Sequence, residues 1–365
     1  MGTIKQNRAN NIVTGGKIDA TDGLNNNVPA ANIANASLTN VTAYPPSAGA
    51  GVSQLASDPP SPTEGQMWYN TTTNTLKQYA QGAGAWATGG SLNTARYILG
   101  GTGTQTASLA IGGDLDPGRV ANTESYNGTS WTEVNDLNTA RQSGGGNGTQ
   151  TSSLAYGGYA TTAQTTLTES WNGTSWTEVN DLNTARIPDG AGADNTSALA
   201  IGGNAPPRQV LTESWNGTSW TEVNDLSTER SGSDSNGIVT SALIYGGSIN
   251  SAPGITANTE SWNGTSWTEV NNLNTAREGL AGAGTDNTLA LATGAHPPVT
   301  PGAITEEWDG TSWAEVGDLS TARGYLAGAG TQTSAIAFGG QAPTGMSSAT
   351  EEWTKGLSVQ TITAS

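Results

Sequence analysis

The 365-residue chain has no cysteine, one histidine and one phenylalanine, and only 12% of its residues are charged. Without cysteine it has no disulfide scaffold and no thiolate nucleophile, and with a single histidine it has no His/Cys cluster of the kind that holds zinc. The lack of cysteine is compatible with every redox compartment and does not select one. A Ser-His-Asp mechanism would have to use His296, which is followed by two prolines in a loop. We therefore expect no catalytic residue, no metal and no cofactor.

Basic residues and long apolar runs are also scarce. The 13 Lys and Arg face 30 Asp and Glu, for a net charge of −17. Nucleic acid is not an expected partner, because no surplus of basic side chains is left to neutralise a phosphate backbone. No apolar run is long enough to span a bilayer, and none follows Lys5 and Arg8 as in a signal peptide. We expect neither membrane insertion nor a signal peptide.

Glycine and tryptophan are abundant instead, with 50 and 12 copies, and the block ESWNGTSWTEVNDLNTAR recurs with few changes. The arginine that closes the block returns every 44 to 47 residues. These arginines are Arg96, Arg141, Arg186, Arg230, Arg277 and Arg323. A period of this size indicates a repeat array, and the Gly-rich composition favours strands and tight turns.

Each period contains four short extended segments. Asn172-Gly173, between Trp171 and Trp176, predicts a type I′ hairpin with positive φ at both turn residues. A lone hairpin of this size is marginally stable, so the repeated tryptophans are expected to be covered by the next copy. The tryptophans that begin the fourth segment are Trp86, Trp131, Trp176, Trp220, Trp267 and Trp313. A period of this length suits a four-stranded propeller blade.

These residues resemble the kelch repeat, which has an Arg near its first strand, a Gly-Gly after its second, and two aromatic residues around its third and fourth. Arg186, Gly202-Gly203, Trp215 and Trp220 occupy these places in one unit. The other units follow, from Trp86 to about Trp353. The resemblance implies an all-β fold, a six-bladed kelch-like β-propeller of four-stranded blades.

The repeats depart from this pattern at three places: Tyr126 replaces one Trp, Gly294-Ala295 replaces one Gly-Gly, and no Trp follows Trp353. The last departure concerns ring closure. Trp86 precedes Arg96 by the same interval as Trp131 precedes Arg141, so we predict that Trp86 supplies the missing outermost strand of the last blade. The alternative is that Leu357 to Ile362 supplies this strand and Trp86 caps the side.

We expect three regions: an extended N-terminal arm at 1–64, a small β-hairpin module at 65–85 and the propeller at 86–365. The arm is rich in Asn and Ala with isolated aliphatic residues, and it is either a disordered leader or a docking segment. Gly65 to Asn70, with Leu76, Tyr79 and Trp86, resembles a G-x-x-W-Y-[ND]…L-x-x-Y…W module of structural proteins of tailed bacteriophages, especially marine ones. The leader is similar to the virion-docking ends of phage fibres.

Acidic residues also recur with the period: Glu124, Glu169, Glu213, Glu260, Glu306 and Glu351. A residue needed once for catalysis has no reason to appear six times, so we expect these carboxylates to pair with the repeat arginines. Calcium binding by scattered carboxylates is an alternative that the sequence leaves undecided. Asp114 and Asp116 are a weak pair for it, far short of a complete calcium loop.

The loops after the Gly-Gly positions differ between repeats while the framework hardly changes. They span 114–120, 159–166, 204–210, 248–257, 296–303 and 341–348. Six unlike loops on one rim of a constant scaffold are typical of a binding surface, although drift of exposed loops would give the same pattern. Arg119, Tyr159, Arg208 and His296 are the candidate ligand-binding residues of this rim.

The resemblance implies a non-enzymatic phage virion protein, a tail fibre or receptor-binding adhesin. Its propeller would bind a host-surface glycan or protein, and its arm would join other virion proteins. We expect a homo-oligomer, by analogy a trimer, located in the virion and assembled in the host cytoplasm. The alternatives are a capsid or tail decoration protein, a carbohydrate-active enzyme with unrepeated acidic residues converging on the central channel, and a cellular kelch-type scaffold.

Overall fold

The computed structural model describes residues 52–142, 144–251, 254–296 and 302–362. Within these ranges the chain is all-β, with thirty strands and no helix, so the described residues include no helix that crosses a membrane. The chain divides into two compact units. One comprises Met1–Ala83 and Lys355–Ser365, and the other Gly84–Thr354.

The first unit contains a four-stranded sheet, here called the small sheet. Its strands, in spatial order, are β1 (Ser53–Leu55), β2 (Met67–Asn70), β3 (Thr75–Gln81) and β30 (Leu357–Ile362). Trp68 is fully buried, and its Nε1 donates to Asp58 Oδ1 at 3.0 Å. Asn70 and Lys77 also donate to this carboxylate, each at 2.9 Å. These hydrogen bonds, with that from Asn70 contributing most, lower the pKa of Asp58 to about 2.

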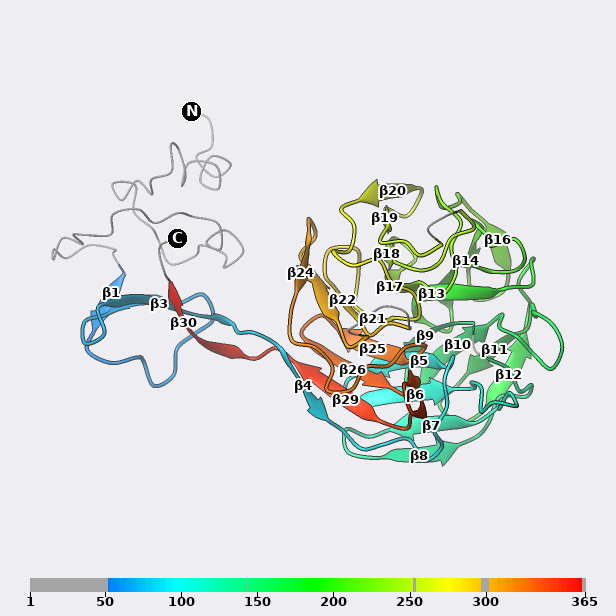
Figure 1. Cartoon of the computed structure of the whole chain (residues 1–365), viewed down its shortest axis with the longest axis horizontal. Coiled ribbons are helices and arrows are strands. Elements are labelled where there is room, and N and C mark those ends of the chain that lie inside the picture. The colour runs from blue at the N-terminus through cyan, green and yellow to red at the C-terminus, as the bar shows by residue number, and fades with distance from the viewer. Residues whose placement is uncertain (1–51, 143, 252–253, 297–301, 363–365) are drawn as a thin grey trace. The chain divides into compact units, whose positions relative to one another are not determined.

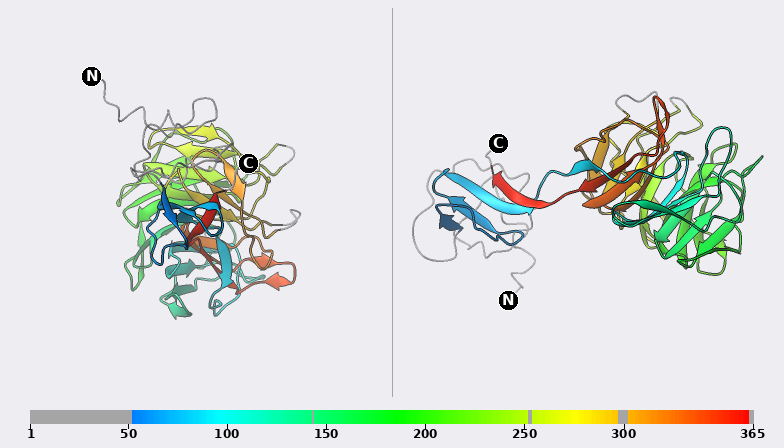
Figure 2. Two further views of the ribbon diagram at one scale, coloured as in Figure 1. Left: turned by 90° about the vertical axis from the view of Figure 1, so that its left-hand side faces the viewer. Right: turned by 90° about the horizontal axis from the view of Figure 1, so that it is seen from below.

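The small sheet changes the expected domain boundaries. The hairpin expected at 65–85 is confirmed by the antiparallel pairing of β2 with β3. Residues 357–362, expected within the propeller, instead pair with β3, from Leu76↔Ile362 to Gln81↔Leu357, and Figure 2 shows these blue and red strands side by side. The expected range 86–365 is therefore wrong at its C-terminal end, because β3 offers a free edge of matching length. Residues 1–51 of the expected arm lie outside the described residues.

Among the described residues, the second unit contains six four-stranded antiparallel sheets, here numbered 1 to 6 in chain order. Sheets 1 and 2 are β5 (Gly100–Thr104), β6 (Ala107–Ile111), β7 (Thr123–Tyr126), β8 (Trp131–Val134), and β9 (Gly145–Thr149), β10 (Ser152–Tyr156), β11 (Thr168–Trp171), β12 (Trp176–Val179). Sheets 3 and 4 are β13 (Ile187–Asp194), β14 (Ser197–Asn204), β15 (Thr212–Trp215), β16 (Trp220–Glu222), and β17 (Asp234–Ile238), β18 (Ser241–Tyr245), β19 (Thr259–Trp262), β20 (Trp267–Val270). Sheets 5 and 6 are β21 (Ala281–Ala283), β22 (Ala290–Thr293), β23 (Thr305–Trp308), β24 (Trp313–Glu315), and β25 (Ala327–Thr331), β26 (Ser334–Phe338), β29 (Thr350–Thr354), β4 (Ala85–Thr88). A two-stranded ribbon, β27 (Gln341–Ala342) and β28 (Gly345–Met346), lies in the loop between β26 and β29.

The sheets form a propeller-like ring (Figure 1). The first strand of each sheet contacts the first strands of both neighbouring sheets, and β25 contacts β5. The tryptophan at or next to the start of each outermost strand donates its Nε1 to a threonine on the third strand of the preceding sheet, at 3.0–3.2 Å. The donor and acceptor pairs are Trp86–Thr305, Trp131–Thr350, Trp176–Thr123, Trp220–Thr168, Trp267–Thr212 and Trp313–Thr259. This cycle of six equivalent bonds explains why Trp and Thr return together in every repeat.

Sheet 6 joins the two ends of the second unit. Its outermost strand is β4, which pairs with β29 so that Trp86 lies opposite Trp353. The prediction that Trp86 closes the last sheet is confirmed, and the alternative strand, Leu357–Ile362, belongs to the small sheet.

The tight turns between the third and fourth strands differ from the expected type. Trp171 and Trp176 pair directly, which confirms the hairpin, but among the two central residues only Gly173 has a positive φ, of 91°. Asn172 instead accepts hydrogen bonds at Oδ1 from the backbone N–H groups of Thr174 and Ser175, both at 2.9 Å. The type I′ assignment is therefore wrong: the side chain of Asn172 caps a four-residue loop, a conformation that leaves no need for positive φ at the asparagine.

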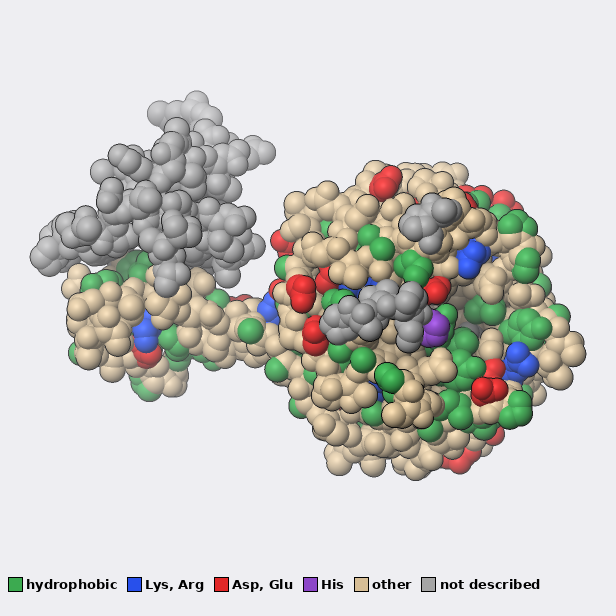
Figure 3. Space-filling model, in the orientation of Figure 1, with side chains coloured by type: hydrophobic (Ala, Val, Ile, Leu, Met, Phe, Trp, Pro, Cys, Tyr) green, Lys and Arg blue, Asp and Glu red, His purple; other side chains and the backbone are tan. Residues whose placement is uncertain are grey.

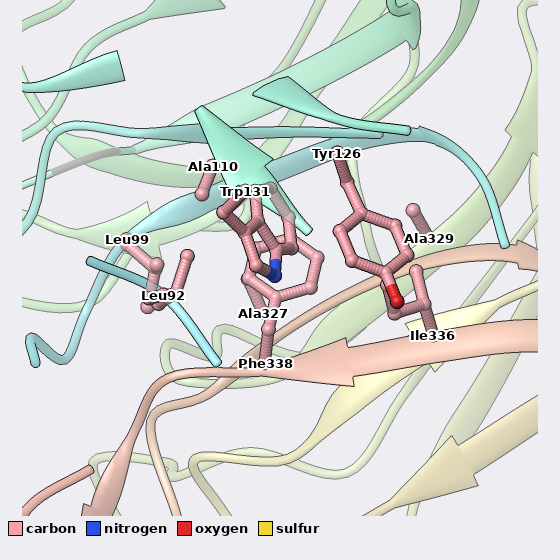
Figure 4. Packing of buried hydrophobic residues seen from close by; sticks show 9 residues of the cluster. All are labelled: Leu92, Leu99, Ala110, Tyr126, Trp131, Ala327, Ala329, Ile336 and Phe338. Carbon is pink, nitrogen blue, oxygen red and sulfur yellow. The ribbon is translucent and has the colours of Figure 1, made fainter. Parts of the chain in front are cut away.

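The core of the ring lies between the sheets rather than within them. At the junction of sheets 6 and 1, Trp131 packs against Phe338, with ring centroids 4.7 Å apart, and against Tyr126, at 4.9 Å (Figure 4). Tyr126, which replaces the usual tryptophan, is fully buried and donates its hydroxyl to Glu352 of sheet 6. Each sheet thus packs its aromatic residues against one another and against the neighbouring sheet, as the repeat pattern predicts.

The repeat arginines and glutamates form buried ion pairs in all six sheets, as expected. Arg141 Nη1 lies 2.6 Å from Glu169 Oε1, and both side chains are almost completely buried. The second carboxylate oxygen of Glu169 accepts from the backbone and side-chain nitrogens of Asn138, both at 2.7 Å. The equivalent pairs are Arg96–Glu124, Arg186–Glu213, Arg230–Glu260, Arg277–Glu306 and Arg323–Glu351. Each pair therefore fixes the segment that enters a sheet to the third strand of that sheet.

Glycine is required where backbones approach closely. A Cβ at Gly157, the first residue of one Gly-Gly, would lie 2.5 Å from the carbonyl oxygen of Arg186, and φ there is +63°. In the innermost strand β13, a Cβ at Gly190 would lie 2.2 Å from the Tyr156 hydroxyl of sheet 2. Such contacts are shorter than real packing allows, so these positions of the ring exclude any side chain.

Candidate functional site

The variable loops all begin beside the entry to the innermost strands. The first loop residue pairs with the residue after the repeat arginine in Tyr97↔Asp114, Gln142↔Tyr159, Ile187↔Asn204, Ser231↔Ser248 and Gly324↔Gln341. In sheet 5 the backbone N–H of His296 donates to Glu278 O at 2.8 Å. The loops therefore share one end of the ring, here called the loop end, as the sequence predicts. Residues 252–253 and 297–301 of two loops lie outside the described residues.

The four rim residues predicted from the sequence lie at three different junctions. The guanidinium of Arg119 stands 4.6 Å from the ring centroid of Tyr159, which joins sheets 1 and 2. Arg208 donates from Nε to Ser231 Oγ at 2.9 Å and from Nη1 to Ile249 O at 3.3 Å, which joins sheets 3 and 4. The ring of His296 lies 4.4 Å from that of Tyr325, at the junction of sheets 5 and 6.

These contacts change the interpretation of the rim. The predicted residues do not converge on one point, and each of them bridges neighbouring sheets. Arg208 is the one among the four that also lines the central cavity. The other three hold the loop end together, and the sequence offered no means of separating these two roles.

A cavity of about 340 Å³ opens among the innermost strands. All six sheets contribute to its wall, much of which is glycine backbone. Its polar and aromatic side chains include Gln142, Asp189, Arg208, Ser231, Asp234, Glu278 and Tyr325. Its volume falls at the lower end of the range of about 300–1,000 Å³ that is typical of small-molecule sites. Figure 3 shows that the face of this unit turned to the viewer carries scattered charged groups on a mostly uncharged surface.

A chain of backbone hydrogen bonds links cavity-lining residues of four sheets. Gly279 N donates to Gly232 O at 2.7 Å, Tyr325 N to Gly279 O at 2.7 Å, and Ile98 N to Tyr325 O at 2.9 Å. All four residues stand two places after a repeat arginine and have positive φ, from 48° to 64°. In sheet 3 this place is taken by Pro188, which has no N–H and a φ fixed near −65°. Pro188 therefore cannot donate a bond of this chain at sheet 3, beside Asp189.

Two unrepeated aspartates line the cavity, Asp189 of β13 and Asp234 of β17. Both lie opposite the second-strand residue that precedes the Gly-Gly pair, Ile201 and Tyr245 respectively. The same place in the other sheets holds Gly100, Gly145, Ala281 and Ala327. The framework therefore does not need a carboxyl group at this position.

Both aspartates are hydrogen-bonded to the neighbouring sheet. Asp189 Oδ2 accepts from the hydroxyl of Ser233 in sheet 4. Asp234 accepts from Ser235 N at 2.6 Å and from Gly282 N of sheet 5 at 2.7 Å. The cavity leaves each side chain some contact with solvent, while protein surrounds the rest of it.

This surrounding protein raises both pKa values. Burial raises the pKa of Asp234 to about 7, although the two backbone N–H groups act in the opposite direction. Burial also raises the pKa of Asp189 well above its usual range, against the hydrogen bond from Ser233 and with a further contribution from the charge of Asp234. The pair therefore holds protons under conditions where ordinary aspartates are ionised.

Sequence reasoning missed these aspartates. The usable signal was positional: acidic residues three or four places after a repeat arginine, where the other repeats carry Gly or Ala. The segment from the repeat arginine to the aspartate is one residue shorter in sheet 3 than in sheet 4. Only an alignment that allows for this difference places Asp189 and Asp234 at the same position.

The described residues contain no group of three or more His, Cys, Asp or Glu side chains that could hold a metal ion. Asp114 accepts from Asp116 N at 2.8 Å and from Gln142 Nε2 at 2.6 Å, so its carboxylate stabilises the loop. The repeated glutamates, each paired with an arginine, do not line the cavity in the part of the chain that the structure describes.

No family model matches the sequence, and no curated protein matches it.

Proposed function

We propose that the chain is a non-enzymatic binding protein of a bacteriophage virion, a tail fibre or receptor-binding adhesin. In this proposal Gly84–Thr354 is a six-bladed kelch-like propeller whose loop end binds a host-surface glycan or protein. The N-terminal segment attaches the protein, as a trimer, to other virion proteins. The phage assignment depends on the sequence resemblances alone, whereas the binding role also has structural support.

One observation supports the binding role: the sequence of the connections hardly changes between repeats at one end of the ring and differs between repeats at the other. At one end, the hairpin turns are nearly identical and are capped by the same side-chain contacts, as at Asn172 and Asn216. At the loop end, the loops are unlike one another and surround a polar cavity. Variation confined to one end of a rigid scaffold is typical of recognition surfaces.

The test is an adsorption assay with the purified full chain. Protein added to host cells before the phage is expected to bind the cells and to block adsorption. Arg208→Ala should weaken this binding, whereas Asn216→Asp, in a hairpin turn at the other end, should leave it unchanged. If the protein fails to bind host cells yet is found on the particle by electron microscopy, it is a decoration protein.

A carbohydrate-active enzyme is the second candidate, and Asp189 with Asp234 favours it. Such an enzyme needs unrepeated acidic residues that converge on the channel, and these two line the same cavity. Glycosidases, however, need one ionised carboxylate beside one protonated acid, whereas here both pKa values are raised. Release of reducing ends from host polysaccharide, lost in both Asp189→Asn and Asp234→Asn, would decide for the enzyme.

A further inference from the structure

The acidic groups that the ring wholly or largely surrounds fall into two classes. Each of the six repeat glutamates has an arginine within ion-pair distance. Asp189 and Asp234 have no such partner among the residues that the structure describes. Arg230, the basic residue that acts on Asp189, is fully buried and already pairs with Glu260 at 2.5 Å. The cavity therefore holds two carboxyl groups whose charge the protein itself does not neutralise.

The other titratable groups near this pair do not change that result. Tyr156 donates its hydroxyl to Leu199 O at 2.9 Å and Tyr245 to Leu291 O at 3.4 Å, and burial keeps both phenols neutral by raising their pKa. Glu278, another lining residue, adds a further acidic group, and Arg208 is held by Ser231 and Ile249. Burial raises the pKa of Tyr325 to about 12, so it is neutral as well.

The cavity wall also changes next to the pair. Pro188 has no N–H with which to extend the chain of backbone hydrogen bonds that links sheets 4, 5, 6 and 1. Asp189 follows Pro188 directly, and its place in the register matches that of Asp234 in the adjacent sheet. The proline, the cavity and the two carboxyl groups without an ion-pair partner thus lie together.

We propose that the central cavity binds a ligand that carries an organic cation, a primary ammonium or a guanidinium group, and that this cation lies against Asp189 and Asp234. The proposal rests on the binding role given above to the loop end, and it adds the site and the ligand class. The cation supplies the charge that arginine supplies to the six glutamates. Its N–H groups donate to carboxylate oxygens in a setting of low dielectric, where charged hydrogen bonds are strongest.

Binding is coupled to ionisation. The free protein holds protons on these groups near neutral pH, and the cation favours their release. Affinity for a cation is therefore expected to fall about tenfold for each pH unit below the pKa of a group that must ionise. A neutral ligand gains nothing from ionisation, and its affinity is expected to change little over the same range.

The experiment is calorimetric titration of the full chain with cyclohexylammonium, whose charge is constant between pH 5.5 and 8.5. Cyclohexanol is the neutral isostere and glucose the neutral sugar. We expect cyclohexylammonium to bind at least about tenfold more tightly than either neutral probe at pH 8. We also expect proton release on binding, measured as a dependence of the heat on the ionisation enthalpy of the buffer.

Asp189→Asn and Asp234→Asn, which keep the side-chain shape, are each expected to weaken cyclohexylammonium binding about tenfold or more. Asp309→Asn is the matched control, because it removes one negative charge in a hairpin turn where four repeats carry asparagine. Near-ultraviolet circular dichroism checks that each variant is folded. If one Asn variant does not fold, the other variant and the wild-type pH dependence still decide.

Equal affinity for cyclohexylammonium and cyclohexanol, or wild-type affinity in both folded Asn variants, would overturn the proposal. Its failure is distinct from failure of the proposed function. Host-cell binding that survives while the cationic probe does not bind leaves the adhesin intact and removes the cavity site. Probe binding without host-cell binding supports the cavity site and removes the adhesin role.

Discussion

Trp86 lies directly opposite Trp353 in sheet 6, although 266 residues separate them in the sequence, and their ring centroids are 5.5 Å apart. The first strand of the ring unit thus completes the sheet formed by its last strands. This pairing gives β29 a second hydrogen-bonding partner. β4 thus takes the outermost place in sheet 6, which the fourth strand takes in each of the other five sheets among the described residues. The pairing of β4 with β29 therefore contributes to closure of the ring, together with the contacts between sheets 1 and 6.

A crosslink tests this closure. Ala87 and Glu352 are directly paired across the two strands, and opposed residues in an antiparallel sheet have Cα atoms about 4.5–5.5 Å apart, within disulfide range. The double variant Ala87→Cys, Glu352→Cys is expected to form a disulfide under oxidation and to gain about 2–4 kcal/mol of stability. The chain has no other cysteine, so thiol titration and chemical unfolding measure both effects. Absence of the crosslink in a folded double variant would contradict the closure, and the single variant Ala87→Cys is the control.

The buried ion pairs are expected to be sensitive to loss of one partner. Arg186→Met leaves the buried carboxylate of Glu213 without its cation and should lower the free energy of unfolding by about 3–5 kcal/mol. Addition of Glu213→Gln should recover part of this loss, because it removes the uncompensated charge. Urea unfolding of both single variants and the double variant measures the coupling. A loss in the single variant below about 1 kcal/mol would mean that the pair is not buried as described.

The aspartates of the cavity predict an unusual pH dependence of stability. The folded state keeps the proton of Asp234 up to about pH 7, whereas the unfolded chain releases it near pH 3.9. Between these values the folded state binds more protons, so stability falls as pH rises through this window and then levels off. Asp189, whose pKa is also raised, extends the fall in the same direction.

The Asp234 contribution is expected to be of the order of 1–4 kcal/mol. Urea unfolding at pH 5, 6, 7 and 8 measures it, with Asp234→Asn expected to flatten the profile and Asp309→Asn expected to leave it unchanged. A wild-type ring that grows more stable from pH 5 to pH 7 would refute the assignment.

The hairpin turns predict which substitutions are tolerated. Asp309 occupies the place of Asn172 in another repeat and accepts the same two backbone hydrogen bonds, from Thr311 and Ser312 at 2.8 Å. Asn172→Asp should therefore change stability by less than about 0.5 kcal/mol, whereas Asn172→Ala, which removes the acceptor, should cost about 1 kcal/mol. Gly173→Ala should cost more than that, because φ is +91°. Thermal unfolding ranks the three variants, and an equal effect of all three would contradict the capping role.

Much of the framework could be predicted because its residues recur in every repeat. The four strands, the Trp86 strand and the Arg–Glu pairs follow from residues that return in register. The turn type was wrong because Asn-Gly is compatible with two loop lengths, and the side-chain cap of Asn172 selected the longer one. The fate of Leu357–Ile362 was open because a six-residue extended segment suits any free sheet edge, and β3 provides one of matching length.

The cavity pair could not be found from composition, because neither Asp189 nor Asp234 belongs to a motif. The roles of the rim residues were likewise undecided, since exposed loop residues that contact a ligand and those that contact the next loop have the same composition. Contacts such as Arg119 over Tyr159 depend on how neighbouring sheets are spaced around the ring. That spacing depends on all six sheets together.

The sequence by itself determined the repeating unit, since the order of polar, glycine and tryptophan residues within about 45 positions dictates local strands and turns. Only the tertiary structure decided what lies at the centre. Side chains from six separate repeats face one another there, and the low dielectric of that enclosed space gives two ordinary aspartates their raised pKa values.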